Sequence, residues 1–183
     1  MKILDIGCST IDRKYKGSNP KDKVIGLDKF HVDGADVIAD LEYSLPFRDN
    51  SFDMVVAKHV LEHIVNFFSV MEEIFRVLKP NGILKVWVPH FSSALAYANP
   101  DHKRYFTAGT FLYFDPDFKE NYYSNARYKA LKIKLNFVGS GIFKFLNYIV
   151  NPIINLRLPF FEKFISPLIS VDEIYFELKV IKE

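Results

Sequence analysis

The chain has 183 residues, enough for one domain with a substantial core and too few for two domains of ordinary size. Hydrophobic residues make up 49% and charged residues 25%, a composition that excludes a disordered chain. The formal net charge is only +2, so the charge balance gives no indication of a nucleic-acid partner.

Five short apolar runs in the first half of the chain are typical of parallel strands buried on both faces. They lie at residues 2–6, 24–27, 37–39, 52–57 and 83–88. The connections at 7–23 and 28–36 are short, so we expect one covering helix to be missing or reduced to a turn. The pattern predicts an α/β fold with a Rossmann-like, doubly wound and mostly parallel sheet.

One amphipathic helix is predicted between the fourth and fifth runs. Apolar residues recur every three or four positions from Ile64 to Leu78, and Pro80 and Gly82 should end the helix. After Pro89 we expect a loop and a short helix with Thr107 as its N-cap. Residues 128–137 and 172–181 alternate as strands do, which predicts an antiparallel edge pair and seven strands in total.

Residues 138–170 form a hydrophobic segment, expected to be a helical insertion before the last strand of a single domain spanning residues 1–183. Its longest uncharged run, residues 145–156, contains Pro152 and is too short to span a bilayer, which needs about 20 residues. The alternatives are two proline-broken helices packed on the sheet, a lid over an apolar substrate, a homodimer surface or a peripheral membrane contact.

Two features favour a cytoplasmic protein. Cys8 is the only cysteine, which excludes an internal disulfide and fits a reducing compartment. The chain enters its first apolar run at once, without the pattern of a secretory signal peptide.

Carboxylates lie in or at the end of three of the predicted strands. Asp5 lies in the first, and Asp28 and Asp40 end the second and third. In an open parallel sheet, ligands bind outside the carboxyl ends of the strands, and a carboxylate about twenty residues after the first turn commonly accepts from ribose hydroxyls. The sequence therefore predicts a nucleotide-type site at this edge.

Four stretches resemble the successive motifs of the class I S-adenosylmethionine-dependent methyltransferases, in particular the type 11 group. They are ILDIGCS, VIGLD, IADLEYSLPFRDNSFDMVVAKHVLEHI and EEIFRVLKPNGILKVWVP. The resemblance covers residues 1–89. It implies S-adenosylmethionine as cofactor and methyl transfer to an acceptor that the sequence does not identify, either a small molecule or a lipid-like compound.

The resemblance also implies roles for individual residues. Gly7 and its neighbours would cradle the methionine end of the cofactor, Asp28 would bind the ribose and Asp40 the adenine amino group. The full set of expected cofactor contacts is Asp5, Gly7, Cys8, Ser9, Asp28, Lys29, Asp40, Leu41, Lys58 and His59. Cys8 is expected to be a packing residue rather than a nucleophile, because no base partner is evident.

Candidates for the acceptor side come from the polar residues after the fifth run. His90, His102, Arg104 and Tyr105 are the predicted substrate contacts. His59 and His102 are the candidates for a catalytic role, with His102 as a general base. No metal site is expected: His59 and His63 are four residues apart, but the sequence places no third ligand beside them.

The first loop departs from the usual glycine-rich pattern, because Ser9 and Ile11 stand where two further glycines would be expected. We expect a loop displaced outward or a weaker cofactor site, and tighter binding in Ser9→Gly. The alternative function is a degenerate relative that binds S-adenosylmethionine or its product and serves as an interaction module.

Overall fold

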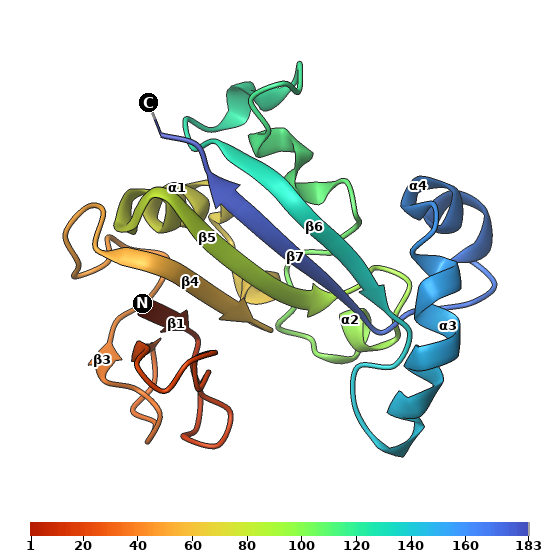
Figure 1. Ribbon diagram of the computed structural model, residues 1–183, viewed down its shortest axis with the longest axis horizontal. Coiled ribbons are helices and arrows are strands. Elements are labelled where there is room, and N and C mark those ends of the chain that lie inside the picture. Colours follow the sequence, from red (N-terminus) through yellow and green to blue (C-terminus); the bar gives the residue numbers. More distant parts are fainter. Residues whose placement is uncertain (183) are drawn as a thin grey trace.

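Seven strands form one mixed sheet in the computed structural model, which describes residues 1–182 (Figure 1). The strand order is β3-β2-β1-β4-β5-β7-β6, parallel from β3 to β5 and antiparallel from β5 to β6. The strands are β1 (Lys2–Ile6), β2 (Lys23–Asp28), β3 (Val37–Ile38), β4 (Phe52–Lys58), β5 (Leu78–Pro89), β6 (Tyr128–Asn136) and β7 (Glu173–Val180). The predicted Rossmann-like sheet with an antiparallel edge pair is confirmed.

Helices are few and short. The α-helices are α1 (Phe67–Val77), α2 (Leu95–Ala98), α3 (Asn147–Ile154) and α4 (Leu158–Phe160). Further helical turns are η1 (Leu61–His63), η2 (Thr110–Phe114), η3 (Asn121–Tyr123), η4 (Ile142–Leu146) and η5 (Phe161–Ile165). In residues 1–182, none of these helices has both the length and the apolar character needed to cross a membrane.

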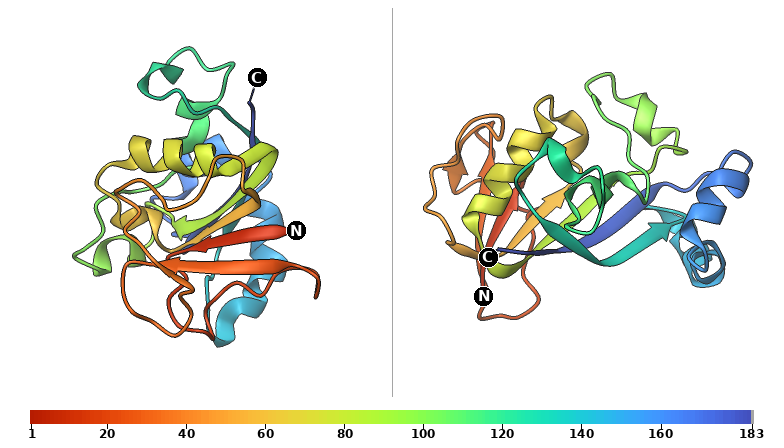
Figure 2. Two further views of the ribbon diagram at one scale, coloured as in Figure 1. Left: turned by 90° about the vertical axis from the view of Figure 1, so that its left-hand side faces the viewer. Right: turned by 90° about the horizontal axis from the view of Figure 1, so that it is seen from above.

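The two faces of the sheet are covered differently. On the face that carries α1, side chains such as Leu4, Val55, Val86 and Phe176 are fully or almost fully buried in the main core. The opposite face has only a small cluster around Ile3, and no helix occurs in the described residues between β1 and β4. Figure 2 shows α1 on one side of the sheet and the connecting loops on the other. Because the connections between β1 and β4 are short, loops rather than helices cover this face of the sheet.

Three local predictions need correction. The predicted helix from 64 to 78 begins only at Phe67 and ends at Val77, because Ile64 and Leu78 are already extended. The KPNG turn lies inside β5 rather than before it, with Asn81 in the left-handed region at φ +64. Thr107 does not cap η2, whose N-cap is Gly109 without a side-chain hydrogen bond.

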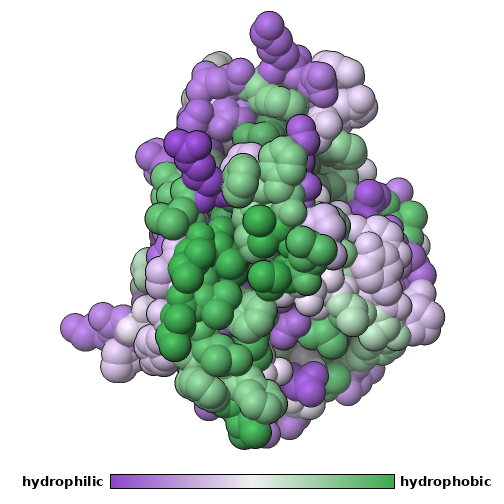
Figure 3. All heavy atoms as spheres, turned by 90° about the vertical axis from the view of Figure 1, so that its right-hand side faces the viewer, coloured by the Kyte–Doolittle hydropathy of each residue, from purple (hydrophilic) through white to green (hydrophobic). Residues whose placement is uncertain are grey.

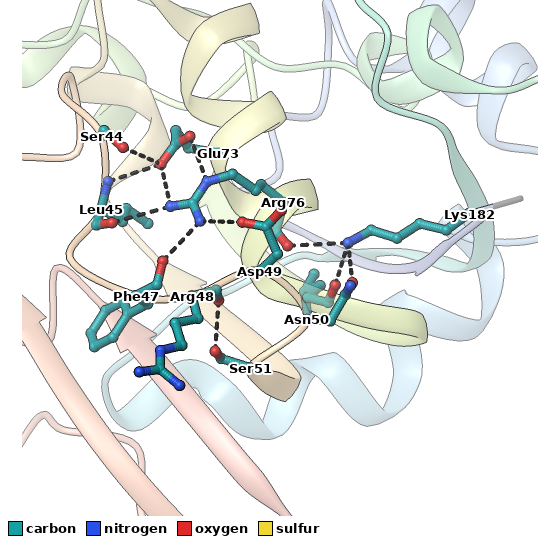
Figure 4. A network of polar contacts seen from close by, with 11 residues as sticks. Ser44, Leu45, Phe47, Arg48, Asp49, Asn50, Ser51, Glu73, Arg76 and Lys182 are labelled. Carbon is teal, nitrogen blue, oxygen red and sulfur yellow. Dashed lines mark hydrogen bonds and ion pairs between the residues drawn. The ribbon is translucent and has the colours of Figure 1, made fainter.

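The LPFRDNS stretch is held in place by Arg76 of α1 (Figure 4). Its guanidinium donates to the carbonyl oxygens of Leu45 and Phe47, at 3.1 and 2.8 Å, and to the Asp49 carboxylate at 2.7 Å. Glu73 accepts from Arg76 and from the backbone N–H of Leu45. Arg76 and Glu73 of α1 therefore fix the loop that leads into β4, away from the predicted site.

Candidate functional site

The carboxyl ends of β1, β2 and β4 meet at one edge of the sheet. Ile6 pairs with Leu27 of β2 and with Ala57 of β4, so the residues that follow these three lie side by side. Two adjoining cavities open at this edge. We call them the Asp28 cavity, with a volume of about 470 Å³, and the His59 cavity, with about 550 Å³.

The first loop is tied to β2. Gly7, at φ +65, and Cys8 both donate their backbone N–H to the carbonyl of Leu27, at 2.8 and 3.2 Å. Ser9 lies in the left-handed region at φ +56 and donates its N–H to Asp28 Oδ2 at 3.0 Å. The loop therefore lies against β2, in contrast to the outward displacement expected from its missing glycines. Its effect on affinity stays a prediction.

Most of the predicted cofactor residues line the Asp28 cavity. Asp28 accepts the N–H of Ser9 and that of Phe30, each at 3.0 Å, and Asp40 accepts the N–H of Glu42 at 3.0 Å. Because each carboxylate oxygen has two lone pairs, both side chains keep acceptor capacity for a ligand. The predicted residues found here are Gly7, Ser9, Asp28, Lys29, Asp40, Leu41 and His59.

The His59 cavity collects the rest of the predicted cofactor residues. It is lined by Asp5, Gly7, Cys8, Ser9, Lys58 and His59 together with the predicted acceptor residue His102. Gly7, Ser9 and His59 also line the Asp28 cavity. One extended ligand can therefore contact both cavities along the Gly7 loop.

Burial shifts the acidity of two groups in the His59 cavity. Asp5 is only 3% exposed, and burial raises its pKa to about 6, although the N–H of Tyr15 at 2.7 Å and the charges of Lys14 and Lys58 oppose the shift. Burial and the nearby Asp5 and Asp28 carboxylates raise the pKa of the Cys8 thiol to about 11. Cys8 is therefore a thiol at neutral pH, in keeping with a packing role.

His59 lies between two carboxylates. Its Nε2 is 3.0 Å from Glu173 Oε2, and its Nδ1 is 3.5 Å from Glu62 Oε1. Burial opposes the charged imidazolium, but the hydrogen bonds to Glu173 and Glu62 outweigh this effect and raise the pKa of His59 to about 9. His59 is therefore protonated at neutral pH, where it can donate a hydrogen bond but cannot act as a general base.

Three predicted acceptor residues do not line either cavity. His90 is fully buried and bonds Ser92 and Glu162 through its two ring nitrogens. Arg104 Nε donates to the Ile64 carbonyl at 3.0 Å, and Tyr105 stacks on Tyr97. Of the four predicted substrate contacts, the fold brings only His102 to the His59 cavity.

Sequence reasoning missed several residues of the His59 cavity, above all Glu62 and Glu173. Glu173 begins β7 and reaches His59 because that strand is antiparallel to β5, so its first residue meets the last residue of β5, Pro89. No local pattern in the sequence signals this contact. Glu62 precedes His63 in the LEH stretch and could have been found from its position next to a predicted site residue.

Comparison with known proteins shows similarity to methyltransferases. Residues 4–86 match the family model described as a methyltransferase domain. Over 120 residues the chain is 31% identical to the sterol 24-C-methyltransferase erg6 of Aspergillus fumigatus, covering 57% of this chain and 32% of that protein. Over 99 residues it is 35% identical to the demethylmenaquinone methyltransferase of Lactococcus lactis, covering 45% of this chain and 39% of that protein. The chain thus spans less than half the length of these curated relatives.

The fold has counterparts among solved structures. A SAM dependent methyltransferase from Archaeoglobus fulgidus superimposes with a TM-score of 0.55 at 19% identity, covering 97% of this chain and 85% of that protein. The fold is that of an α/β protein of the Rossmann-like class. Residues 4–86, just under half of the chain, thus match a methyltransferase-domain family, and the fold of the chain is similar to that of a SAM dependent methyltransferase.

Proposed function

We propose that this protein is a methyltransferase that binds S-adenosylmethionine along the Gly7 loop and methylates a small, lipid-like acceptor. The observation that carries the proposal is the pair of adjoining cavities at the carboxyl ends of β1, β2 and β4, with Asp28 on one side and His59 on the other. Ligands bind at this edge in open α/β sheets.

The hydrogen-bond acceptors and the apolar side chain that line the Asp28 cavity fit an adenosine group. Asp28 would accept from the ribose hydroxyls, Asp40 from the adenine amino group, and Leu41 offers apolar contact. The cofactor supplies a methyl group that is already activated on a positive sulfur, so the protein mainly has to orient the acceptor and shield the reaction from water. Asp5, ionised above pH about 6, would attract the cationic methionine end.

The acceptor is proposed to enter from a third cavity. This cavity, of about 610 Å³, shares Lys58, Gly139 and Glu173 with the His59 cavity and is also lined by Trp87 and Phe145. Aromatic rings beside lysines suit an apolar molecule with an anionic or polar end. The two relatives named above methylate a sterol and demethylmenaquinone, which supports a lipid-like acceptor for this chain.

We further propose that residues 142–169 contact the surface of an anionic membrane. Figure 3 shows apolar side chains gathered on the face formed by α3, α4 and their flanking turns. Tyr148, Leu156 and Leu168 are 87%, 79% and 84% exposed. Such a surface is costly in water and is typical of an interfacial contact.

The charges of this segment favour a bilayer over a second copy of the chain. Lys144, Arg157 and Lys163 are exposed, whereas the one carboxylate, Glu162, is turned inward and accepts from the Ala108 N–H at 2.6 Å and His90 at 3.1 Å. Three outward cations without an outward anion would repel each other across a symmetric dimer contact. They are attracted to anionic lipids, by about 1 kcal/mol each.

The cofactor assignment is tested with Asp28→Asn in isothermal titration of S-adenosylmethionine. We expect the affinity to fall at least tenfold, because an amide has one acceptor oxygen and cannot both hold the loop and bind the ribose. The control is Asp33→Asn: Asp33 accepts the Ile11 N–H at 2.9 Å in the same loop pair but lines neither cavity. Equal losses in both variants would contradict the assignment.

Activity is tested separately by transfer of a labelled methyl group from the cofactor into total lipid and polar extracts. We expect label in the lipid fraction with the wild-type protein and much less with Asp28→Asn. Cofactor binding without any transfer would instead support the alternative of a degenerate binding module.

A further inference from the structure

A compact group of potential metal ligands lies in the wall of the His59 cavity. Glu62, His63 and His102 each offer one ligand atom, and these three atoms lie within 4.8 Å of one another. All three residues line the His59 cavity. We infer that they form a binding site for a divalent first-row transition metal ion, with a further coordination position open to that cavity.

The tautomers of the two histidines suit metal binding. His63 Nδ1 is 3.0 Å from Asp101 Oδ2, and His102 Nδ1 is 2.9 Å from the carbonyl oxygen of Ala96. Both partners only accept, so each Nδ1 carries the proton and each Nε2 keeps a free lone pair in the neutral ring. In histidines that bind a metal, the other ring nitrogen usually donates its proton to an acceptor of this kind.

The Glu62 carboxylate supplies an independent indication. Its side chain is 2% exposed, and its Oε2 is the one buried side-chain oxygen or nitrogen without a hydrogen-bond partner in residues 1–182. Its Oε1 faces His59 Nδ1 at 3.5 Å. A buried carboxylate oxygen without a partner is costly, so Oε2 is poised to take a cation.

The backbone holds the three ligands together although they are far apart in sequence. The N–H groups of Lys103 and Arg104 both donate to the Glu62 carbonyl oxygen, at 2.7 and 3.2 Å. This pins the 99–104 loop against η1, and the rings of His63 and His102 lie 4.8 Å apart. Around a tetrahedral ion at about 2.1 Å, ligand atoms are roughly 3.4 Å apart, so rotations that move them by about an ångström would close the site.

The chemistry of the ligand set defines the class of ion. Two imidazoles and one carboxylate suit Zn²⁺ and other first-row divalent ions rather than Mg²⁺ or Ca²⁺, which prefer oxygen ligands. An ion held here would face the same cavity as Gly7 and His59. It would bind an oxygen of the proposed acceptor and lower the pKa of an acceptor hydroxyl. That role rests on the proposed function, whereas metal binding itself does not.

The site is tested by isothermal titration of the metal-free protein with Zn²⁺ at pH 7.5, and by the visible spectrum of the protein with Co²⁺. We expect one Zn²⁺ per chain, and Co²⁺ bands of a site with fewer than six ligands. His102→Ala and Glu62→Gln should each weaken Zn²⁺ binding at least tenfold, and Asp101→Asn about tenfold through His63. The matched control is His31→Ala, which removes an exposed histidine of the 29–36 loop that does not line the His59 cavity.

Two results would overturn the inference. One is the absence of both heat and Co²⁺ bands at millimolar metal. The other is an equal loss of binding in His31→Ala and His102→Ala, which would indicate surface binding. Thermal unfolding of each variant without metal checks that it is folded. Because Zn²⁺ binding is measured without cofactor, its failure is distinguishable from a failure of the methyltransferase assignment.

Discussion

At the scale of single residues, Asp5 shows how burial moves the pKa of a carboxyl group toward neutrality. The sequence places it in the first strand, but its pKa depends on the cover provided by the 9–16 loop, whose Tyr15 N–H donates to it. Burial raises this pKa to about 6, against 3.8 for an unperturbed aspartate. Asp5 therefore titrates close to neutrality, in the cavity proposed for the methionine end of the cofactor.

We expect the affinity for S-adenosylmethionine to fall about tenfold as the pH is lowered from 7.5 to 5. Protonation of Asp5 removes a negative charge next to a cationic ligand, an effect on the order of 1 kcal/mol. Isothermal titration across this range measures it. Asp5→Asn should bind weakly at both pH values, and a steep pH dependence that survives in this variant would assign the titration to another group.

Asp5 also makes the free energy of unfolding depend on pH, in a direction that follows from its raised pKa. Because its pKa is higher in the folded state than in the unfolded chain, Asp5 binds its proton more tightly when folded. Its contribution to the free energy of unfolding therefore increases as the pH falls from about 6 to about 4. Above pH 6 the buried carboxylate is a cost, which Asp5→Asn should remove.

At the scale of elements, the loop from β3 to β4 depends on α1. Arg76 makes hydrogen bonds to Leu45, Phe47, Asp49 and Glu73, so one side chain organises a stretch without secondary structure. Lys182 adds contacts to the carbonyl oxygen of Arg76 and to Asn50 (Figure 4). The LPFRDNS stretch is thus held in place by side chains from α1 and from the end of the described chain.

We expect Arg76→Ala to lower the free energy of unfolding by about 1 to 3 kcal/mol, because it leaves carbonyl and carboxylate acceptors without their donor. Urea denaturation followed by circular dichroism measures the change. Arg48→Ala is the matched control, since Arg48 is exposed in the same loop and its guanidinium points away from the network, so its effect should stay within about 0.5 kcal/mol (Figure 4). Similar losses in both variants would show that the network is not what holds the loop.

At the scale of the whole molecule, the protein is asymmetric. One face of the sheet is sealed by α1 and the phenylalanines of the 106–114 stretch, while the other has only loops and a small cluster. The helices after β6 stand at the end of the sheet with their apolar side chains outward (Figures 1 and 3). The third cavity lies beneath them, so a membrane contact there would bring a lipid-like acceptor next to His59.

We expect the protein to float with vesicles that contain phosphatidylglycerol, and to do so less at high salt. Leu156→Asp and Leu168→Asp should abolish flotation, because both side chains are exposed on the proposed contact. Leu131→Asp, which changes an exposed leucine on β6, should not. A dimer in light scattering that Leu156→Asp dissociates, together with no flotation, would contradict the membrane proposal in favour of self-association.

The sequence by itself determined the sheet and predicted the edge at which we propose that the cofactor binds. Runs of apolar residues predict the strands, and the carboxyl ends of parallel strands lie at one edge of the sheet. The sequence therefore predicted that Gly7, Asp28 and Lys58 lie close together. The limits of the elements were harder to predict, as at Thr107 and the KPNG turn, because hydrogen bonds from distant residues decide where a helix or strand ends.

Only the tertiary structure decided what surrounds His59. Glu173 reaches it because β7 pairs antiparallel with β5, whose partner residues are 84 to 96 positions away in the sequence. His102 reaches Glu62 and His63 because the next two residues donate backbone hydrogen bonds to the Glu62 carbonyl oxygen. The structure also places His90 and Arg104 outside the two cavities, where they bond Glu162 and the Ile64 carbonyl oxygen. Such contacts join residues with no fixed spacing, because loop closure and strand pairing, not local periodicity, bring them into register.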